Sequence, residues 1–103
     1  MMEKTYNGTA VHVNDQGYLT DFNEWNREVG MEIAAEEEIE MTDEHWEVID
    51  YIQDQFQKDV ALSIRGIKNS GVINIKDFYR LFPGGPLKKA SKIAGIPKPV
   101  SCI

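Results

Sequence analysis

Cysteine is nearly absent from this sequence: its 103 residues include one, Cys102, at the penultimate position. A single thiol excludes an intrachain disulfide framework and the usual zinc sites, which need several cysteines. No apolar run approaches the roughly 20 residues of a membrane span, and the first residues lack the apolar stretch of a signal peptide. We therefore expect a cytoplasmic protein that has no membrane partner.

Residues suited to catalysis or metal binding are scarce as well. The two histidines, His12 and His45, form no catalytic set with a nucleophile. The acidic stretch 36–40 lacks the glycine and the loop spacing of a calcium site. Gly84-Gly85 lacks both the strand context and the Lys-Ser/Thr pair of a phosphate-binding loop. The sequence thus indicates neither a metal nor a cofactor.

Basic residues are rare in positions 1–59, which hold 16 acidic and 3 basic side chains. Positions 60–103 reverse this balance, with 1 acidic and 8 basic side chains. The net charge of −6 therefore hides a basic C-terminal part, which suits an acidic partner or a nucleic acid. The acidity of the whole chain argues against a general nucleic-acid coat protein.

Composition and periodicity predict one domain, residues 1–103, of the α+β class and mostly α. The alternation over residues 9–13 and the turn at 14–17 predict a small N-terminal β-meander. Capping residues and apolar spacing predict a compact array of about five short helices, beginning at Asp21, Thr42, about Val60, Asn74 and Pro86. The first of these carries its apolar residues from Phe22 to Ile33 on one face. Two prolines exclude a helix after Gly95, so residues 95–103 are predicted to form an extended arm.

The predicted helices within residues 60–82, joined by an Asn-Ser-Gly turn, have the order of a helix-turn-helix. In that interpretation four cations would contact DNA phosphates: Arg65, Lys68, Lys76 and Arg80. A DNA-binding regulator is therefore an alternative function. The spacing is loose, however, and short helix pairs are common in small helical proteins.

The C-terminal arm gives its cysteine an unusual setting. From Ile96 to Ile103 an extended arm would reach roughly 25 Å, at about 3.1 Å per residue. A thiol on such a tether can visit two active sites in turn, and the prolines limit the entropy lost on binding. The reactive form is the thiolate, which nearby cations such as Lys98 and the 88–92 lysine cluster favour. The alternative is an incidental thiol with no function.

The segments LFPGGPLK (81–88) and KIAGIPKP (92–99), with the final Cys102-Ile103, resemble the C-terminal signature of the DsrC/TusE sulfur-relay family. Segments 15–19, 25–26 and 41–49 resemble other blocks of that family, so the similarity covers most of the chain. The resemblance implies a sulfur carrier, in which Cys102 accepts persulfide sulfur from an upstream donor protein and presents it to a downstream acceptor enzyme. Such a protein is a co-substrate more than a self-contained enzyme and requires no cofactor. Arg65 and Lys98 are candidates for steadying the arm or its anionic sulfur.

Two branches of the family differ in their cysteines. In the DsrC branch, the partner is dissimilatory sulfite reductase, and a second cysteine stands eleven positions before the last. That position here is Ser91, so the chain lacks the thiol for a two-cysteine cycle. The resemblance therefore favours the TusE type, which relays sulfur toward tRNA thiolation, with an accessory gamma-type partner of a sulfite reductase as the alternative. The chain also departs from many members at Leu62, where they have proline, and in the shorter stretch between Arg65 and Leu81.

Overall fold

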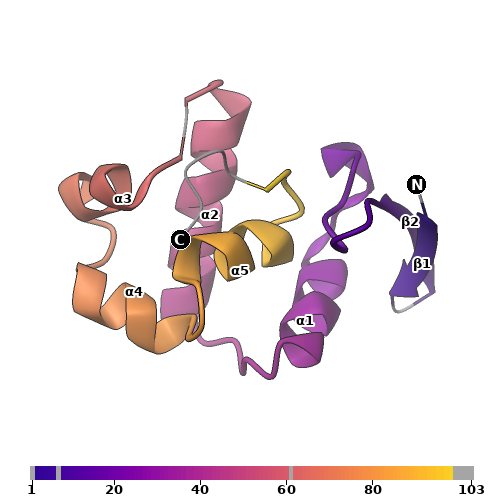
Figure 1. Ribbon diagram of the computed structural model, residues 1–103, viewed down its shortest axis with the longest axis horizontal. Coiled ribbons are helices and arrows are strands. Elements are labelled where there is room, and N and C mark those ends of the chain that lie inside the picture. Colours follow the sequence, from indigo (N-terminus) through magenta and orange to yellow (C-terminus); the bar gives the residue numbers. More distant parts are fainter. Residues whose placement is uncertain (1, 7, 61, 99–103) are drawn as a thin grey trace.

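The computed structural model describes residues 2–6, 8–60 and 62–98, with a two-stranded sheet at one end of an array of helices (Figure 1). In chain order its elements are β1 (Met2–Tyr6), β2 (Thr9–Val13), the 3-10 turn η1 (Phe22–Glu24), α1 (Arg27–Glu36), α2 (Asp43–Gln57), α3 (Ile64–Ser70), α4 (Ile75–Leu81) and α5 (Pro86–Ile93). The predicted α+β, mostly helical class is confirmed. Cys102 lies outside the described residues, so the position of this thiol stays a prediction.

The sheet is an antiparallel hairpin in which Met2 pairs with Val13 and Tyr6 with Thr9. The return strand expected for a β-meander is reduced to one isolated bridge between Val13 and Leu19. The reason is local, because the Asn14 side chain accepts hydrogen bonds from the backbone N–H groups of residues 16 and 18. These bonds curl the chain into a tight loop before a third strand can extend.

The prediction of one continuous helix from Asp21 is wrong. Asp21 caps only η1, and the chain is extended again at Trp25. Asn26 then begins α1, with its side chain accepting from the Val29 N–H at 2.9 Å. Glu24 accepts a hydrogen bond from the backbone N–H of His12 at 2.8 Å and thereby ties η1 to β2.

The other helix starts follow local capping signals. Helices α2, α4 and α5 begin after Thr42, after Asn74 and at Pro86, as predicted. Helix α3 begins four residues later than the predicted Val60, because Ser63 caps it by accepting from the Gly66 N–H at 3.0 Å. Each helix in the described part of the chain is too short or too polar to cross a membrane.

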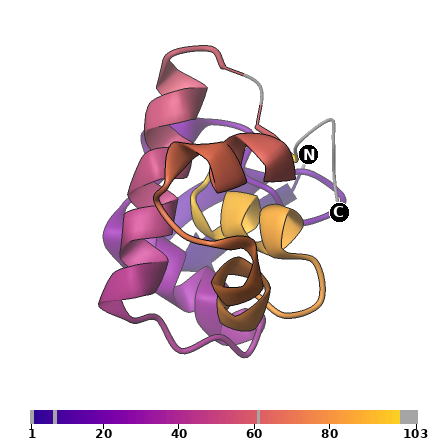
Figure 2. The same ribbon diagram turned by 90° about the vertical axis from the view of Figure 1, so that its left-hand side faces the viewer.

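Helix α5 lies in the middle of the helical array, as Figures 1 and 2 both show. It packs against α1, α2 and α4. Its inward side chains Leu87, Ala90 and Ile93 are fully buried among residues from every other helix, and the same core includes Val11 and Val13 of the hairpin. The position and orientation of α5 are therefore fixed by the core, and so is the point where the chain leaves it.

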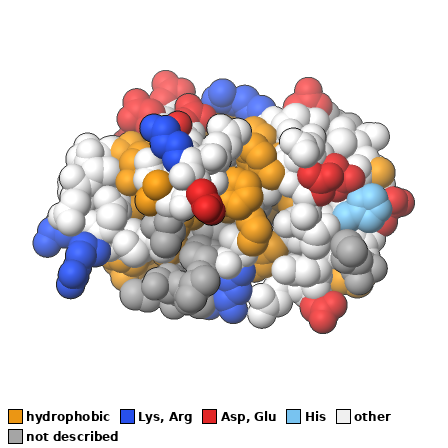
Figure 3. Space-filling view, turned by 90° about the horizontal axis from the view of Figure 1, so that it is seen from above, with side chains coloured by type: hydrophobic (Ala, Val, Ile, Leu, Met, Phe, Trp, Pro, Cys, Tyr) orange, Lys and Arg blue, Asp and Glu red, His pale blue; other side chains and the backbone are white. Residues whose placement is uncertain are grey.

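Charge is distributed unevenly over this fold. Figure 3 shows lysine and arginine side chains at the end of the molecule where α3 and α4 lie, and acidic side chains at the end where the sheet lies. The two charges are not fully separated, because acidic and basic side chains also lie side by side elsewhere on this face and the ion pairs Lys92–Glu37 and Arg80–Glu44 join the two parts of the sequence.

Candidate functional site

The predicted arm begins at a tightly built helix end. The Ile96 N–H donates to the Ser91 carbonyl and the Gly95 N–H to the Lys92 carbonyl, both at 3.2 Å, which is the Schellman pattern. Gly95 has φ 75°, in the left-handed region that favours glycine. A Cβ at Gly95 would also overlap the Trp25 side chain, so both the conformation and the space require glycine here.

Two side chains from distant segments hold the last carbonyls of α5. The Trp25 indole Nε1 donates to the Ile93 carbonyl at 2.7 Å, and the Gln53 amide Nε2 donates to the Ala94 carbonyl at 2.9 Å. The indole fits because Gly30 has no side chain, since a Cβ there would lie 2.9 Å from the Trp25 ring. The residues from Ala94 to Ile96, called the arm root below, are thus anchored to α2 and to the segment before α1.

A hollow of about 280 Å³ lies beside the arm root. It brings together four lysines, three from α5 and one from the residues after it: Lys88, Lys89, Lys92 and Lys98. Gln16 and Tyr18 line it from the loop after β2, Glu37 from the end of α1 and Gly84 from the loop before α5. We call this hollow the lysine pocket. Sequence reasoning placed the four lysines on the helix and arm, and all four line this hollow.

One of these lysines is held firmly. The Lys92 ammonium pairs with the Glu37 carboxylate at 3.1 Å, and both side chains are only about a fifth exposed, at 20% and 24%. Lys92 runs over Gly17, where an added Cβ would lie 3.1 Å from its Cε atom. The Tyr18 hydroxyl donates to the Lys88 carbonyl at 3.2 Å and joins the loop to α5. The wall of the pocket is therefore rigid on this side.

The predicted supporting residues separate in the structure. Lys98 lines the lysine pocket with its side chain exposed. Arg65 is exposed on α3, a helix that contributes no residue to the pocket. The structure therefore joins Lys98 to the three lysines of α5 but leaves Arg65 apart from them.

Ser91 is fully buried on the inward side of α5. Its hydroxyl is the one buried side-chain nitrogen or oxygen atom, among the described residues, without a hydrogen-bond partner. An unpaired buried hydroxyl costs about 1–3 kcal/mol. The site therefore suits a small apolar side chain or a thiol better than it suits serine.

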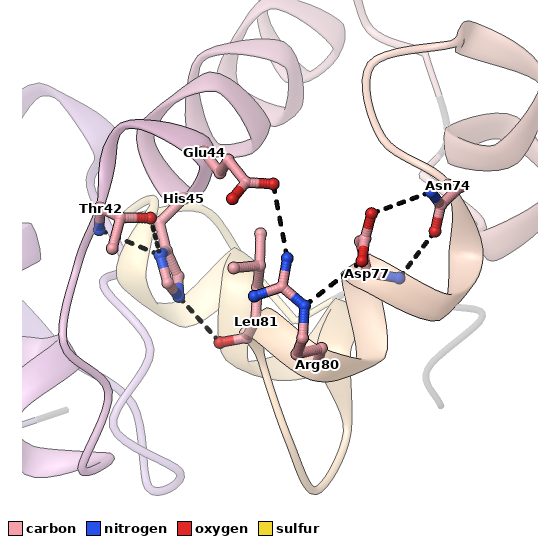
Figure 4. Close-up of polar contacts among 7 residues, drawn as sticks. All are labelled: Thr42, Glu44, His45, Asn74, Asp77, Arg80 and Leu81. Atoms are coloured by element: carbon pink, nitrogen blue, oxygen red, sulfur yellow. Dashed lines mark hydrogen bonds and ion pairs between the residues drawn. The ribbon is translucent and has the colours of Figure 1, made fainter.

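A polar cluster that sequence reasoning missed joins the start of α2 to the end of α4 (Figure 4). The backbone N–H of Thr42 donates to Nδ1 of His45 at 3.0 Å, so Nδ1 carries no proton. The proton is then on Nε2, which donates to the Leu81 carbonyl at 2.9 Å. His45 is buried and its contacts are structural, in agreement with the prediction that it belongs to no catalytic set. The signal was a Thr-x-x-His spacing at a helix start, which resembles a capping box.

The cations of the predicted helix-turn-helix do not converge. Arg80 pairs with Asp77 at 3.3 Å and with Glu44 at 3.5 Å (Figure 4), so its charge is largely compensated. Lys68 and Lys76 are exposed on two different helices, α3 and α4. This arrangement does not favour the DNA-binding alternative.

Shifted pKa values occur in the acidic N-terminal part. Hydrogen bonding to Glu24 raises the pKa of His12, and the backbone and ring of His12 lower the pKa of Glu24. Partial burial acts to raise the pKa of Glu36, but hydrogen bonds from Lys4 and Tyr6 outweigh it and lower that pKa. These carboxylates are ionised partners that hold β1 and β2 to α1 and η1.

Residues 5–103 match the family described as "DsrC like protein". The protein named "Sulfurtransferase TusE" from Photorhabdus laumondii is 37% identical over 100% of both chains. The solved structure described as "Crystal structure of dissimilatory sulfite reductase I (DsrI)" has a chain that is 32% identical with a TM-score of 0.87, covering 99% of this chain and 100% of that one. The NMR structure of DsrC from Allochromatium vinosum is 31% identical with a TM-score of 0.84, at the same coverage.

Proposed function

The chain belongs to the DsrC-like protein family, and from this premise we propose that it is a single-cysteine sulfur carrier similar to the TusE sulfurtransferases. The observation that carries the proposal is family membership over residues 5–103 together with one thiol in the whole chain, at the penultimate position. Cys102 is the nucleophile and the carrier. The protein acts between a sulfur donor protein and an acceptor enzyme as their shared co-substrate.

The transfer is balanced without an external oxidant. The Cys102 thiolate attacks the outer sulfur of a donor persulfide, a new S–S bond forms, and the donor cysteine leaves as a thiolate. Delivery repeats the exchange, because an acceptor thiolate attacks the outer sulfur and Cys102 leaves as a thiolate. Each step therefore moves one sulfur atom and no net electrons.

The arm root supports this role by giving the carrier a fixed starting point. Hydrogen bonds from Trp25 and Gln53 hold the end of α5. The extended arm predicted from the sequence would carry Cys102 about 12 Å beyond Lys98, at about 3.1 Å per residue. A rigid root with a short arm limits the volume that the thiol explores and favours productive docking.

The lysine pocket supports the anionic forms of the carrier. An ordinary cysteine has a pKa of about 8.5, and neighbouring cations lower it. We propose that Lys98 is such a cation, since it is close in sequence to Cys102 and exposed beside the other pocket lysines. Arg65 is a weaker candidate for this role, because its helix, α3, contributes no residue to the pocket.

Ser91 favours tRNA thiolation over the two-cysteine chemistry of sulfite reduction. A buried serine offers no thiol to a persulfide on Cys102, so the sulfur must pass to another protein. We propose a tRNA-thiolating enzyme as that acceptor, in keeping with the TusE relatives. A sulfite reductase is the second candidate acceptor, because a chain in a structure described as dissimilatory sulfite reductase I shares the fold.

Intact-mass analysis after incubation with a persulfide donor tests the proposal. We expect the wild-type chain to gain the mass of one sulfur atom and Cys102→Ser to gain none. Adding a tRNA-thiolating enzyme or a sulfite reductase to the loaded carrier then shows which acceptor removes the sulfur. An unchanged wild-type mass, or an equal gain on Cys102→Ser, would refute sulfur carriage by this cysteine.

A further inference from the structure

The lysine pocket contains cations that lack counter-charges. Lys88, Lys89 and Lys98 form no ion pair with another described residue, and Glu37 compensates Lys92 alone. This is notable in a chain with 17 acidic and 11 basic residues, where carboxylates are in excess. Ammonium groups gathered around one hollow repel each other, so the protein is stabilised when an anion enters.

Four other cations of the described part have partners, whereas Arg65, Lys68 and Lys76 form no ion pair with a described residue and line no part of this pocket. The pairs are Lys4 with Glu36, Lys58 with Asp54, and Arg80 with Asp77 and Glu44, while Arg27 lies over the Trp46 ring at 4.2 Å. The lysine pocket differs from the rest of the surface because its unpaired cations gather around one hollow. Their accumulation around one hollow points to a ligand that supplies the missing negative charge.

The donors around the pocket come from different directions. Spacings of three and four residues place Lys88 and Lys89 on the same side of α5 as Lys92, and Lys98 comes from beyond the arm root. Gly84 brings the backbone to the pocket where α5 begins, and that helix start has no side-chain cap. The partial positive charge of the helix N-terminus therefore adds to that of the ammonium groups.

We propose that the lysine pocket binds a small dianionic oxyanion of phosphorus or sulfur, with phosphate, sulfate and thiosulfate sharing the required chemistry. Four lysines and one glutamate leave three positive charges, which a dianion balances better than a carboxylate does. The several oxygens of an oxyanion can also accept from donors that approach from different sides. A volume of about 280 Å³ holds such an ion with part of its hydration water. The inference does not depend on sulfur carriage by Cys102.

A nucleic-acid backbone fits this site less well. Glu37 lines the pocket, and the exposed Glu38 and Glu40 follow it directly in the chain. A polyanion that extended past the pocket would meet these carboxylates, whereas a small ion would not. The structure therefore favours a compact ligand.

Titration of the full-length, isotope-labelled protein followed by amide NMR tests the site. Sodium sulfate, phosphate and thiosulfate are the probes, with sodium chloride and acetate at matched ionic strength as controls. We expect saturable shifts confined to Gly17, Tyr18, Gly84 and the pocket lysines, with the three probes binding about fivefold or more tighter than acetate. The ranking of the three ions identifies the preferred source of the oxyanion. Shifts that chloride or acetate reproduce at equal ionic strength would overturn the proposal.

A matched pair of double variants separates a built site from general screening. Lys88→Gln with Lys89→Gln removes two pocket charges, and Lys68→Gln with Lys76→Gln removes two exposed charges outside it. We expect the first pair to weaken sulfate binding by about fivefold or more and the second to leave it nearly unchanged. Equal effects of both pairs would contradict a specific site. If the first pair perturbs folding, the exposed Lys98→Gln gives the same comparison.

Discussion

Replacing Gly95 with alanine isolates what the arm root contributes to stability. Gly95 has φ 75°, and a Cβ there would overlap the Trp25 side chain. Gly71 offers a matched control, because it has nearly the same φ of 78° but nothing within 4 Å of an added Cβ. Gly71→Ala therefore has only the free-energy cost of a left-handed backbone conformation. Gly95→Ala has that cost and must also displace the Trp25 indole.

The difference between these two variants follows from the contacts of Trp25. The left-handed conformation costs a residue with a side chain about 1 kcal/mol, and this applies to both positions. Displacing the indole breaks its 2.7 Å hydrogen bond and leaves the Ile93 carbonyl unpaired, at about 1–3 kcal/mol. Forcing a methyl group into this packed site adds about 1–3 kcal/mol. We expect Gly95→Ala to lower the free energy of unfolding by about 3–7 kcal/mol in total.

Urea unfolding followed by tryptophan fluorescence measures both variants, with thermal melting as a second readout. A gap of at least about 2 kcal/mol between them corresponds to roughly 8 °C or more in Tm for a chain of this size. Persulfide loading of Cys102, measured by intact mass, reports on the arm in the same samples. If Gly95→Ala and Gly71→Ala destabilise equally, Trp25 does not hold the arm root and the reasoning fails.

Three further predictions concern other contacts of the fold. Ser91→Ala should raise the free energy of unfolding by about 1 kcal/mol, because it removes a buried hydroxyl without a partner; a loss of stability in urea would show that the hydroxyl is bound. His45→Ala should cost about 2–3 kcal/mol by freeing both Thr42 and the Leu81 carbonyl, and His45→Gln, which can keep the cap, should cost less in the same assay. Glu36 has a pKa below its ordinary value of 4.5 in the folded chain, so its stabilising contribution is complete above that pH and is lost as the pH falls through the folded pKa. Glu36→Gln should therefore flatten stability measured against pH in the acid range, and an unchanged acid profile would contradict this role.

Features set by neighbouring residues were predictable from the sequence. Thr42, Asn74 and Pro86 mark helix starts because each satisfies or avoids backbone donors within its own turn. Gly95 likewise ends α5 through local geometry. The break at Trp25 was not predictable in this way, since the indole is drawn to a carbonyl 68 residues away in the sequence. Tertiary contact overrides helical periodicity at that point.

In the candidate site, too, contacts between neighbouring residues could be predicted from the sequence and contacts between distant segments could not. Lys88, Lys89 and Lys92 could be placed together because they share one side of a predicted helix. No local pattern assigns Glu37 or Tyr18 to the same pocket, because they come from separate segments that meet only after folding. The His45 cluster combines a local and a distant contact. The hydrogen bond between Thr42 and His45 could have been predicted from their spacing, but the bond from His45 to Leu81 spans 36 residues.

Helix α5 contributes to the core on one side and to the lysine pocket on the other, and variants can test the two contributions separately. Its inward side, with Leu87, Ala90 and Ile93, belongs to the core, while its lysines face the pocket and its end forms the arm root. We therefore expect changes at the root to alter stability and sulfur delivery together, since the proposed carrier arm starts from the residues that these hydrogen bonds hold. Changes at the half-buried Lys88 and Lys89 leave the core intact and alter charge alone. A lysine variant that lost oxyanion binding yet still loaded Cys102 would show that one helix serves two independent sites.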